Sequence, residues 1–257
     1  MKHNLLLAFS FALRDFKERY VGTGLGQLWY VLSPMITIFI YTVIFSDFMK
    51  MKMNIIDNSY AYSIYLVPGL LAWTSFSTII MRLNTSFEQK ANLIKKINVP
   101  MFTFQFAIVI TEFLLFILSI LLGIGFLFIV HQDVTLTFLW LLPVMFLQTI
   151  FAFSLGVIFS LFTPFFKDLK EAIPVIIQLW FWATPIIYMS ELLQKKYPLL
   201  LVYNPFYYFA HIYQDIFLYS RHPSINSLLI ITIMSIVSLL IAGYLYKKMI
   251  STIKDII

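Results

Sequence analysis

Side chains that could carry out catalysis are few and widely spaced in this sequence. His131 lies close to Asp133, and His211 lies close to Asp215, but both pairs fall at the edges of apolar segments without a nucleophile nearby. The histidines form no i,i+4 pair of the kind that binds zinc on a helix. The absence of cysteine excludes thiolate catalysis and Cys-ligated metal centres. We therefore predict no catalytic residue and no metal site.

A glycine-rich turn is the second place where chemistry could occur. Gly22, Gly24 and Gly26 could cradle a phosphate, but no expected strand precedes them and no Gly-Lys-Ser/Thr follows. The sequence G-x-x-x-x-G-K-[ST] occurs nowhere in the chain, so the chain does not hydrolyse ATP through a P-loop and no cofactor is expected in it. Instead, the glycines give the backbone freedom to turn.

Glu112 is the ionisable side chain that lies well inside an apolar segment. Placing a charged group at the centre of a bilayer costs about 2.5–3.5 kcal/mol on the insertion scale. A proton relay usually needs a second acid, a histidine or a lysine at similar depth, and the expected spans contain none. We therefore expect Glu112 to face a cavity or a polar partner in a structural role.

Composition indicates that a membrane positions these residues. The chain has 257 residues, of which 61% are hydrophobic and 12% are charged, and its mean hydropathy is +0.88. Soluble domains are about 45–50% apolar and about 25% charged, so we predict an all-α membrane protein with one domain, residues 1–257. The net charge of +6 could suggest nucleic acid. The basic residues lie mainly in loops, however, where they set orientation, so no nucleic-acid partner is expected.

Six segments are long and apolar enough to span a membrane, which takes about 20 residues. They are residues 28–48, 60–81, 102–130, 136–162, 172–189 and 227–246. Most of the 18 lysines and arginines fall on one side if both termini are cytoplasmic. Residues 1–27 are then a cytoplasmic interfacial helix and turn, 28–189 hold spans one to five, 190–226 form outer helices, and 227–257 are span six and a cytoplasmic tail.

The segment before the first span has the pattern of an amphipathic helix. Its apolar side chains recur at helical spacing on one face, and two i,i+4 ion pairs are expected on the other. The apolar residues are Phe9, Leu13, Phe16 and Tyr20, and the expected pairs are Arg14 with Glu18 and Asp15 with Arg19. We expect this helix to lie in the membrane interface with its apolar face in lipid.

Two of the expected spans carry residues that could line a path. The first has four polar or aromatic side chains on one helical face, and the fifth is interrupted by proline and has Gln178 near its middle. Irregular backbone at membrane depth is tolerated where protein or a water-filled path satisfies it. The alternative for Ser and Thr is a bond to a carbonyl of their own helix. The channel-lining candidates are Tyr30, Ser33, Thr37, Tyr41, Gln178, Phe181, Trp182 and Pro185.

Two inside loops and one outside segment are candidates for contacts and gating. A short amphipathic helix between spans two and three, and the loop after span four, could dock onto a cytoplasmic partner, although a solvated loop is the alternative. Their candidate residues are Phe87, Glu88, Lys90, Ile94, Lys95, Lys167 and Asp168. The outside segment is too short to span twice and suggests a re-entrant helix pair. Its aromatic residues could form an interfacial belt or an exit gate, for which the candidates are Tyr203, Pro205, Tyr207 and Tyr208.

Four stretches, in the same order over nearly the whole chain, resemble a known family. They are R-D-F-K-E-R-Y-V-G-T-G-L-G-Q-L-W-Y-V-L-S-P from Arg14, N-L-I-K-K-I-N-V-P from Asn92, F-F-K-D-L-K-E-A-I-P-V-I-I-Q-L-W-F-W-A-T-P-I-I-Y from Phe165, and Y-N-P-F from Tyr203. The family is the type-2 ABC transporter permease that exports cell-surface polysaccharide, above all O-antigen, with capsule and teichoic acid exporters as relatives.

The resemblance implies a homodimer in the bacterial inner membrane, paired with two copies of a separate ATPase subunit that holds ATP and Mg²⁺. It also implies a lipid-linked polysaccharide as substrate, a path lined by spans one and five, coupling through the two inside segments, and a gate formed by the outer helices. Two alternatives remain open: a type-2 exporter of small lipids or drugs, and the less favoured membrane-embedded glycolipid transferase.

Overall fold

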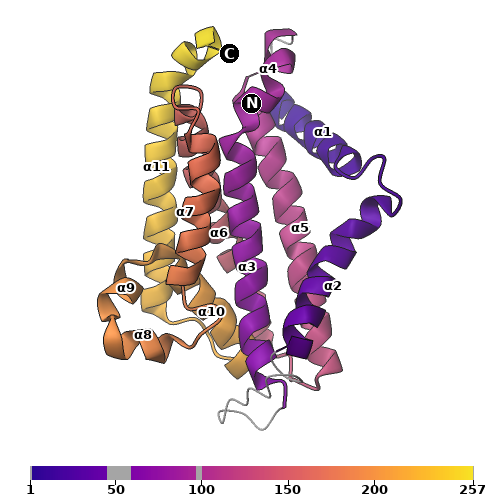
Figure 1. Ribbon diagram of the computed structural model, residues 1–257, viewed down its shortest axis with the longest axis vertical. Helices are drawn as coiled ribbons and strands as arrows, with labels where there is room; N and C mark the ends of the chain where they lie inside the picture. The colour runs from indigo at the N-terminus through magenta and orange to yellow at the C-terminus, as the bar shows by residue number, and fades with distance from the viewer. Residues whose placement is uncertain (1, 45–58, 97–99, 257) are drawn as a thin grey trace.

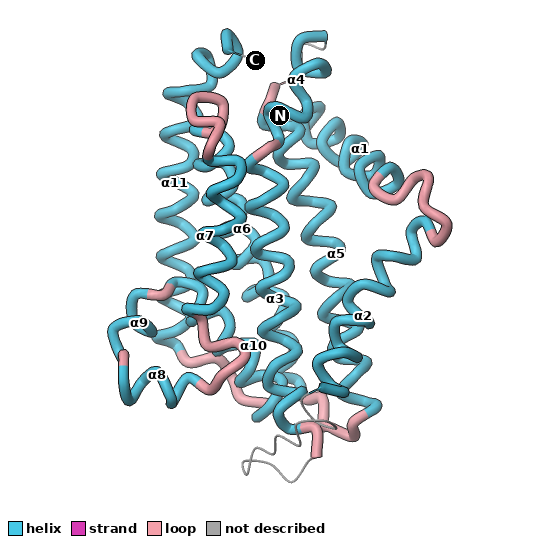
Figure 2. Tube along the Cα trace, viewed as in Figure 1, coloured by secondary structure: helices cyan, strands magenta, loops and turns pink. Residues whose placement is uncertain are grey.

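The computed structural model describes residues 2–44, 59–96 and 100–256, and the regular elements within these ranges are all helices (Figures 1 and 2). This confirms the all-α prediction. The elements are α1 (Lys2–Glu18), η1 (Gly26–Leu28), α2 (Trp29–Thr42), α3 (Ala61–Asn84), α4 (Ser86–Lys96), α5 (Phe102–Ile129), η3 (Leu136–Trp140), α6 (Leu141–Phe162), α7 (Leu169–Ala183), α8 (Ser190–Lys196), α9 (Pro198–Tyr203), α10 (Pro205–Tyr219) and α11 (Ile225–Ile256).

Helix α3 forms the centre of the bundle. It packs against α5, α6 and α10, and 83% of its most apolar window is buried. By contrast, α11 packs on α6 and only 17% of its window is buried, so it presents most of its apolar surface outward. Apolar surface left exposed on this scale is typical of a helix that faces lipid.

Four of the described helices are long and apolar enough to cross a membrane, and they match the second, third, fourth and sixth expected spans. They cover Ala61–Asn84, Phe102–Ile129, Leu136–Phe162 and Ile225–Ile253. The first and fifth expected spans contain the shorter helices α2 and α7, of 14 and 15 residues. Such lengths reach only about 21–23 Å, less than the roughly 30 Å hydrocarbon core. Residues 45–48, the end of the first expected span, lie outside the described residues, so six spans remain a prediction.

The end of α7 has a clear local cause. Pro185 disfavours helical backbone in the residue before it, and Thr184 accordingly adopts extended angles, φ −103° and ψ 130°. The helix therefore stops at Ala183, and the chain continues as irregular backbone into α8. Pro185, one of the prolines that suggested a broken fifth span, therefore ends the helix near the C-terminal end of that span.

Helix α1 lies across the end of the bundle at a steep angle to the long helices (Figure 1). It packs on α5, with Ala8 and Ala12 buried, while Leu6, Phe9 and Leu13 are exposed. The turn that follows contains Gly22 at φ 88° and Gly26 at φ 51°, a left-handed conformation that favours glycine. This turn redirects the chain into α2, as expected, whereas the lipid contact of α1 remains a prediction.

Candidate functional site

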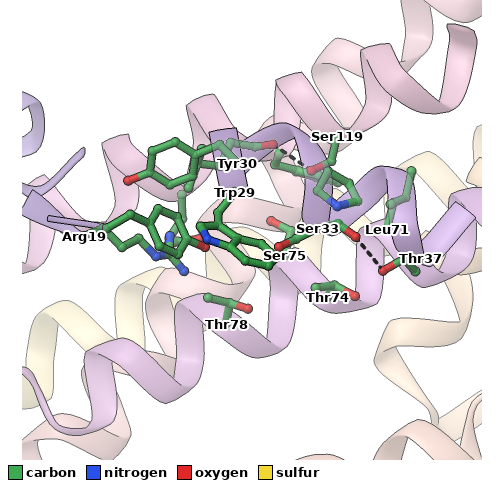
Figure 3. Close-up of a pocket in the computed structure, with 15 residues that line it drawn as sticks. Arg19, Trp29, Tyr30, Ser33, Thr37, Leu71, Thr74, Ser75, Thr78 and Ser119 are labelled. Atoms are coloured by element: carbon green, nitrogen blue, oxygen red, sulfur yellow. Dashed lines mark hydrogen bonds and ion pairs between the residues drawn. The ribbon is translucent and has the colours of Figure 1, made fainter. Parts of the chain in front are cut away.

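A pocket of about 140 Å³ lies between α2, α3 and α5. Three of the four residues expected on one face of the first span, Tyr30, Ser33 and Thr37, contribute to its lining. Figure 3 shows the side chains of Arg19, Trp29, Ser33 and Ser75 gathered around it. The opposite wall is formed by hydroxyl-bearing residues of α3 and by α5; these lining residues are Leu71, Thr74, Ser75, Thr78, Glu112, Leu115, Phe116 and Ser119.

A second pocket, of about 400 Å³, lies between α2, α3 and α7. It is lined by Tyr41, Gln178 and Phe181 from the expected path, together with Trp73 of α3. Thr37 and Thr74 line both pockets, so the two pockets adjoin along α3. We call the two adjoining pockets together the groove. The structure therefore brings the expected faces of the first and fifth spans to the same surface.

The groove is polar mainly through hydroxyl groups. Thr37 donates to the carbonyl of Ser33 at 3.0 Å, and Thr74 donates to the carbonyl of Leu70 at 2.8 Å. The back-bonding alternative therefore holds for both threonines, although their oxygens can still accept a hydrogen bond. Among the described residues, none bonds to the buried hydroxyl oxygen of Ser75, which leaves one polar group of the groove wall unpaired.

Trp182 and Pro185, also expected on the path, do not line the groove. The Trp182 side chain is 58% exposed on the outer side of α7. Pro185 is buried, and its carbonyl accepts hydrogen bonds from the Tyr65 hydroxyl at 3.3 Å and the Gln214 amide at 3.2 Å. In this single chain, Pro185 connects the end of α7 to α3 and α10 instead of facing the groove.

A cluster of four charged side chains lies beside the groove, and two of them, Arg19 and Glu112, line its first pocket. One carboxylate oxygen of Glu112 contacts Arg19 at 2.8 Å and Arg82 at 2.5 Å, and Arg82 also contacts Asp15 at 2.7 Å. The Glu112 side chain is only 5% exposed. Two positive and two negative charges balance in this cluster, which lets the carboxylate stay buried. The expected polar partner of Glu112 is thus a pair of arginines.

The same cluster corrects one detail of the interfacial helix. The Arg14–Glu18 pair forms at 2.7 Å, as expected. The Asp15–Arg19 pair is wrong, because Asp15 binds Arg82 and Arg19 binds Glu112 instead. Buried partners compete successfully with a neighbour on an exposed helix face, where ion pairs contribute little.

Tyr30 connects α2 to α1. Its hydroxyl donates to the carbonyl of Phe16 at 2.6 Å, and its ring stacks on Phe16 with centroids 4.3 Å apart. The Tyr20 ring approaches edge-on at 4.8 Å, and the Arg19 guanidinium lies 5.9 Å from the Tyr30 centroid. Although Tyr30 borders the groove, most of its surface is buried in this contact between α1 and α2.

The two expected inside contact segments meet in the structure. Glu88 on α4 pairs with Lys170 on α7 at 3.3 Å. Next to this pair, the buried Asn84 accepts from the Thr163 hydroxyl at 2.5 Å and donates to the carbonyl of Leu169 at 3.5 Å. The bend between α3 and α4 is therefore bonded to the bend between α6 and α7.

The other residues expected in these segments differ in accessibility. Phe87 is buried at 2% exposure, so it holds α4 on the bundle and is not a surface contact. Lys167 and Asp168 are exposed, whereas Lys90 is half-buried beside a small pocket between α1 and α5. Ile94 and Lys95 lie on α4, but their side chains are outside the described part of the structure.

Asn204, the residue before Pro205, bonds the start of α10 to the end of α7. Its side-chain oxygen accepts from Trp180 Nε1 at 2.8 Å and caps α10 through the Phe206 N–H at 3.1 Å. Its amide donates to the Ala183 carbonyl at 3.1 Å and the Thr184 hydroxyl at 2.9 Å. Of the residues expected to form a gate, Tyr203 is 80% exposed, and Pro205, Tyr207 and Tyr208 are half-buried.

Comparison with known proteins assigns this arrangement to a family. The family model described as ABC-2 type transporter matches residues 7–218, a range that includes the four helices of the groove, α2, α3, α5 and α7. This chain belongs to the ABC-2 type transporter family. The expected family is thereby confirmed, and the chain is a membrane subunit of a transporter.

Three relatives of this ABC-2 transporter illustrate the similarity. An O-antigen export system permease protein RfbA of Klebsiella pneumoniae is 33% identical over 210 residues, 80% of this chain and 79% of the relative. A protein of the same name from Myxococcus xanthus is 28% identical, with 94% of this chain and 92% of the relative covered. The polysialic acid transport protein KpsM of Escherichia coli is 23% identical, with 91% and 90% covered.

Sequence reasoning missed several residues that organise this ABC-2 transporter. Arg82 was considered only for orientation, although its position at the inner end of an apolar segment could have marked it as a partner for Glu112. The hydroxyl residues of α3 give a polar stripe that was also overlooked. Asn204 stood inside the Y-N-P-F stretch, and an Asn before Pro is a recognisable N-cap signal.

Proposed function

We propose that this chain is the permease of an ATP-driven exporter that moves a lipid-linked polysaccharide of the O-antigen type outward across the bacterial inner membrane. The observation that carries the proposal is the groove, whose walls of hydroxyl groups and aromatic rings come from α2, α3, α5 and α7. Family membership and the names of the relatives support an exported surface polysaccharide as the cargo.

The groove suits a sugar chain because it offers many weak contacts. Hydroxyl oxygens that already bond to their own helix, such as Thr37 Oγ1 and Thr74 Oγ1, can still accept from a sugar hydroxyl. The rings of Trp73, Tyr41 and Phe181 offer flat apolar faces. Stacking on such faces does not depend on the identity of each sugar, so the chain can slide without being trapped.

A second copy of this chain completes the channel in our proposal. Helices α2 and α7 flank the groove, and each exposes a row of large apolar side chains. Soluble monomeric proteins rarely expose apolar patches of this extent, so we expect these rows to be covered. These residues are Met35, Ile36, Phe39, Ile40, Val175, Ile176, Leu179 and Trp182. In a homodimer they face the partner, the lumen or lipid. This arrangement keeps Trp182 as a candidate for the channel wall formed by both copies, whereas Pro185 is buried within each copy.

Each subunit crosses the membrane six times in this proposal, with α2 and α7 as parts of the first and fifth spans. Both described ends of the chain lie at the same end of the bundle (Figure 1), which agrees with two cytoplasmic termini. Helix α1 then lies in the inner interface, held by the charge cluster. The helix pair that contains Tyr203, Pro205, Tyr207 and Tyr208 lies at the outer exit as a gate.

Two copies of a separate ATPase subunit bind ATP and Mg²⁺ and dock on the inner surface formed by α4 and the start of α7. The Glu88–Lys170 pair and the Asn84 bonds join these segments, so a push on either one reaches α3 and α7 together. Because α3 and α7 are two walls of the groove, closure of the ATPases can change the width of the groove directly.

The transport proposal is tested in inside-out vesicles that contain this chain, its ATPase and the lipid-linked glycan. Adding ATP should move glycan into the vesicle lumen, and Tyr41→Ala together with Phe181→Ala should slow that flux. Tyr244→Ala removes an exposed tyrosine from α11, away from the groove, and serves as the matched control. If the groove variants transport at the control rate, the aromatic path is wrong. If ATP moves a small lipid or drug but no glycan, the cargo assignment fails.

The coupling surface has its own prediction. Lys170→Glu places two carboxylates together, and because both side chains are partly exposed we expect at most about 1 kcal/mol of destabilisation. Transport per ATP hydrolysed should nevertheless fall, and Glu88→Lys combined with Lys170→Glu should restore it by reversing the pair. Failure of the double variant to restore transport would show that the pair does not join the two segments functionally.

A further inference from the structure

A third pocket, of about 210 Å³, lies at the end of the bundle opposite the charge cluster. We call it the outer pocket. Its walls come from the second turn of α3, the start of α8, and the last two turns of α10 with the residues that follow. The polar and aromatic residues that line it are Tyr65, Ser190, His211, Gln214, Asp215, Tyr219 and Arg221. It therefore adjoins the start of α3, a helix that also forms a wall of the groove, and Met189 of the segment that follows α7.

The charged groups of the outer pocket are held in place by α10. His211 Nδ1 lies 3.0 Å from Asp215 Oδ2, one helical turn away. After Tyr219 the chain turns back through Ser220, at φ 51°, and the Arg221 N–H donates to the Asp215 carbonyl at 3.3 Å. The Arg221 guanidinium then lies 4.5 Å from the centroid of the Tyr219 ring. Donor, acceptor and ring are thus gathered at one opening.

The remaining wall is fixed by hydrogen bonds to the segment after α7. Gln214, which is 4% exposed, donates its amide to the Pro185 carbonyl at 3.2 Å. The Tyr65 hydroxyl contacts the Tyr188 carbonyl at 3.0 Å. These bonds tie α3, α10 and the irregular segment together, so the outer pocket is preformed in the single chain.

The chemistry of the lining excludes several classes of ligand. A phosphate or carboxylate ligand is disfavoured because Asp215 would repel it. Calcium takes six to eight oxygen ligands, and the described residues contain no group of three His, Asp or Glu side chains that could hold a metal. An acyl chain would cover the side chains of Asp215 and Arg221 without offering either of them a hydrogen bond.

A sugar ring fits the same lining. Each sugar hydroxyl both donates and accepts a hydrogen bond, so neighbouring hydroxyls can pair with the Asp215 carboxylate on one side and with Arg221 or His211 on the other. The Tyr219 ring, which already contacts the Arg221 guanidinium, adds an apolar edge to the same lining. The volume is below the roughly 300–1,000 Å³ of pockets for drug-sized ligands, which suits one sugar residue and not a whole oligosaccharide.

We propose that the outer pocket binds one sugar residue of the exported glycan as the chain leaves the groove. This inference rests on the proposed function, because it takes the glycan to be the cargo. Binding at the exit would hold the emerging chain while the ATPases reset, and so would oppose backward sliding.

The test measures binding of a defined probe to the intact transporter. The complex of this chain with its ATPase is reconstituted in lipid nanodiscs without ATP, and the probe is the delipidated repeat oligosaccharide of the producing cell's own surface polysaccharide. Saturation-transfer difference NMR reports the affinity. Asp215→Asn and Arg221→Gln each remove one charge-assisted hydrogen bond, and we expect binding to weaken roughly ten- to hundredfold.

The matched controls make the same charge changes elsewhere on the outer surface. Asp133→Asn and Lys196→Gln alter exposed residues outside the pocket and should bind the probe like the wild type. Because Arg221 is exposed and follows α10, its substitution should leave folding intact even if Asp215→Asn does not. Equal affinity of Arg221→Gln and wild type, or no binding by the wild type, overturns the outer-pocket proposal.

The vesicle assay separates this inference from the function on which it rests. If the wild type transports glycan but the two pocket variants bind the probe normally, only the outer-pocket proposal fails. If ATP moves no glycan through the wild type, the proposed function itself fails.

Discussion

Substituting Glu112 with Gln removes the negative charge that both Arg19 and Arg82 contact. The cluster then holds two guanidinium groups and only the Asp15 carboxylate, a net charge of +1 in a partly buried site. Breaking a buried ion pair from one side costs about 3–5 kcal/mol. The two arginine side chains are 27% and 25% exposed, so water can reach them and we expect the lower end, about 3 kcal/mol.

The lost stability should appear mainly as detachment of α1 from the bundle, because Asp15 connects α1 to the bundle and Arg19 connects the turn after α1 to it. Hydrogen–deuterium exchange of peptides covering α1, measured on the reconstituted transporter, reports this opening. About 3 kcal/mol corresponds to exchange roughly a hundredfold faster, since each 1.4 kcal/mol is a factor of ten. Glu18→Gln is the matched control, because it breaks the exposed Arg14–Glu18 pair and should cost only about 0.2–1 kcal/mol.

A double variant checks the electrostatic reasoning. Combining Arg19→Gln with Glu112→Gln restores charge balance and leaves the Arg82–Asp15 pair intact. Exchange in α1 should then be slower than in Glu112→Gln alone. If Glu112→Gln exchanges as slowly as Glu18→Gln, or if the double variant exchanges faster than either single one, the cluster does not hold α1.

Two further predictions concern packing. Gly156→Ala would place a methyl carbon 2.6 Å from Leu83 Cδ1 and 2.8 Å from Leu83 Cβ. We therefore expect about 1–3 kcal/mol of destabilisation and a lower melting temperature. The control is Gly243→Ala, which has open space around the added methyl group and should melt no lower than wild type. Asn204→Leu leaves the Trp180 indole N–H without its acceptor and removes the cap of α10. The two losses together should lower the free energy of unfolding by about 2–3 kcal/mol. A melting temperature within experimental error of wild type would contradict this prediction.

The all-α fold and four of the membrane helices could be predicted because their signals are local. A run of about 20 apolar residues predicts a spanning helix wherever it lies in the chain, and the long helices α5 and α11 follow directly from such runs. The ends of α7 were harder to place. Pro185 indicated a break, but only the structure shows that helical backbone stops at Ala183 and continues as irregular chain.

The sequence predicted residues of the candidate site correctly only where helical spacing alone determines which side chains share a face. Ser33, Thr37 and Tyr41 recur at helical intervals on one face of α2 and do reach the groove. Trp182 and Pro185 were predicted to line the path by the same helical spacing. That rule assumes that the helix is unbroken and that the element it packs against is known. Because the helix ends between them, Pro185 turns to α3 and α10 instead.

The partners of Glu112 show why buried polar contacts are beyond a sequence pattern. Arg82 lies 30 positions before Glu112 in the chain and Arg19 lies 93 before it, and no local rule connects such distant residues. What the sequence does provide is the requirement: a carboxylate in an apolar segment must be paired with a cation or face a cavity. Here it does both, since Glu112 pairs with two arginines and borders the groove. Glu112 therefore contacts the turn after α1 through Arg19 and also borders the groove, so we expect a movement of α1 and a change in that part of the groove to be linked through this side chain.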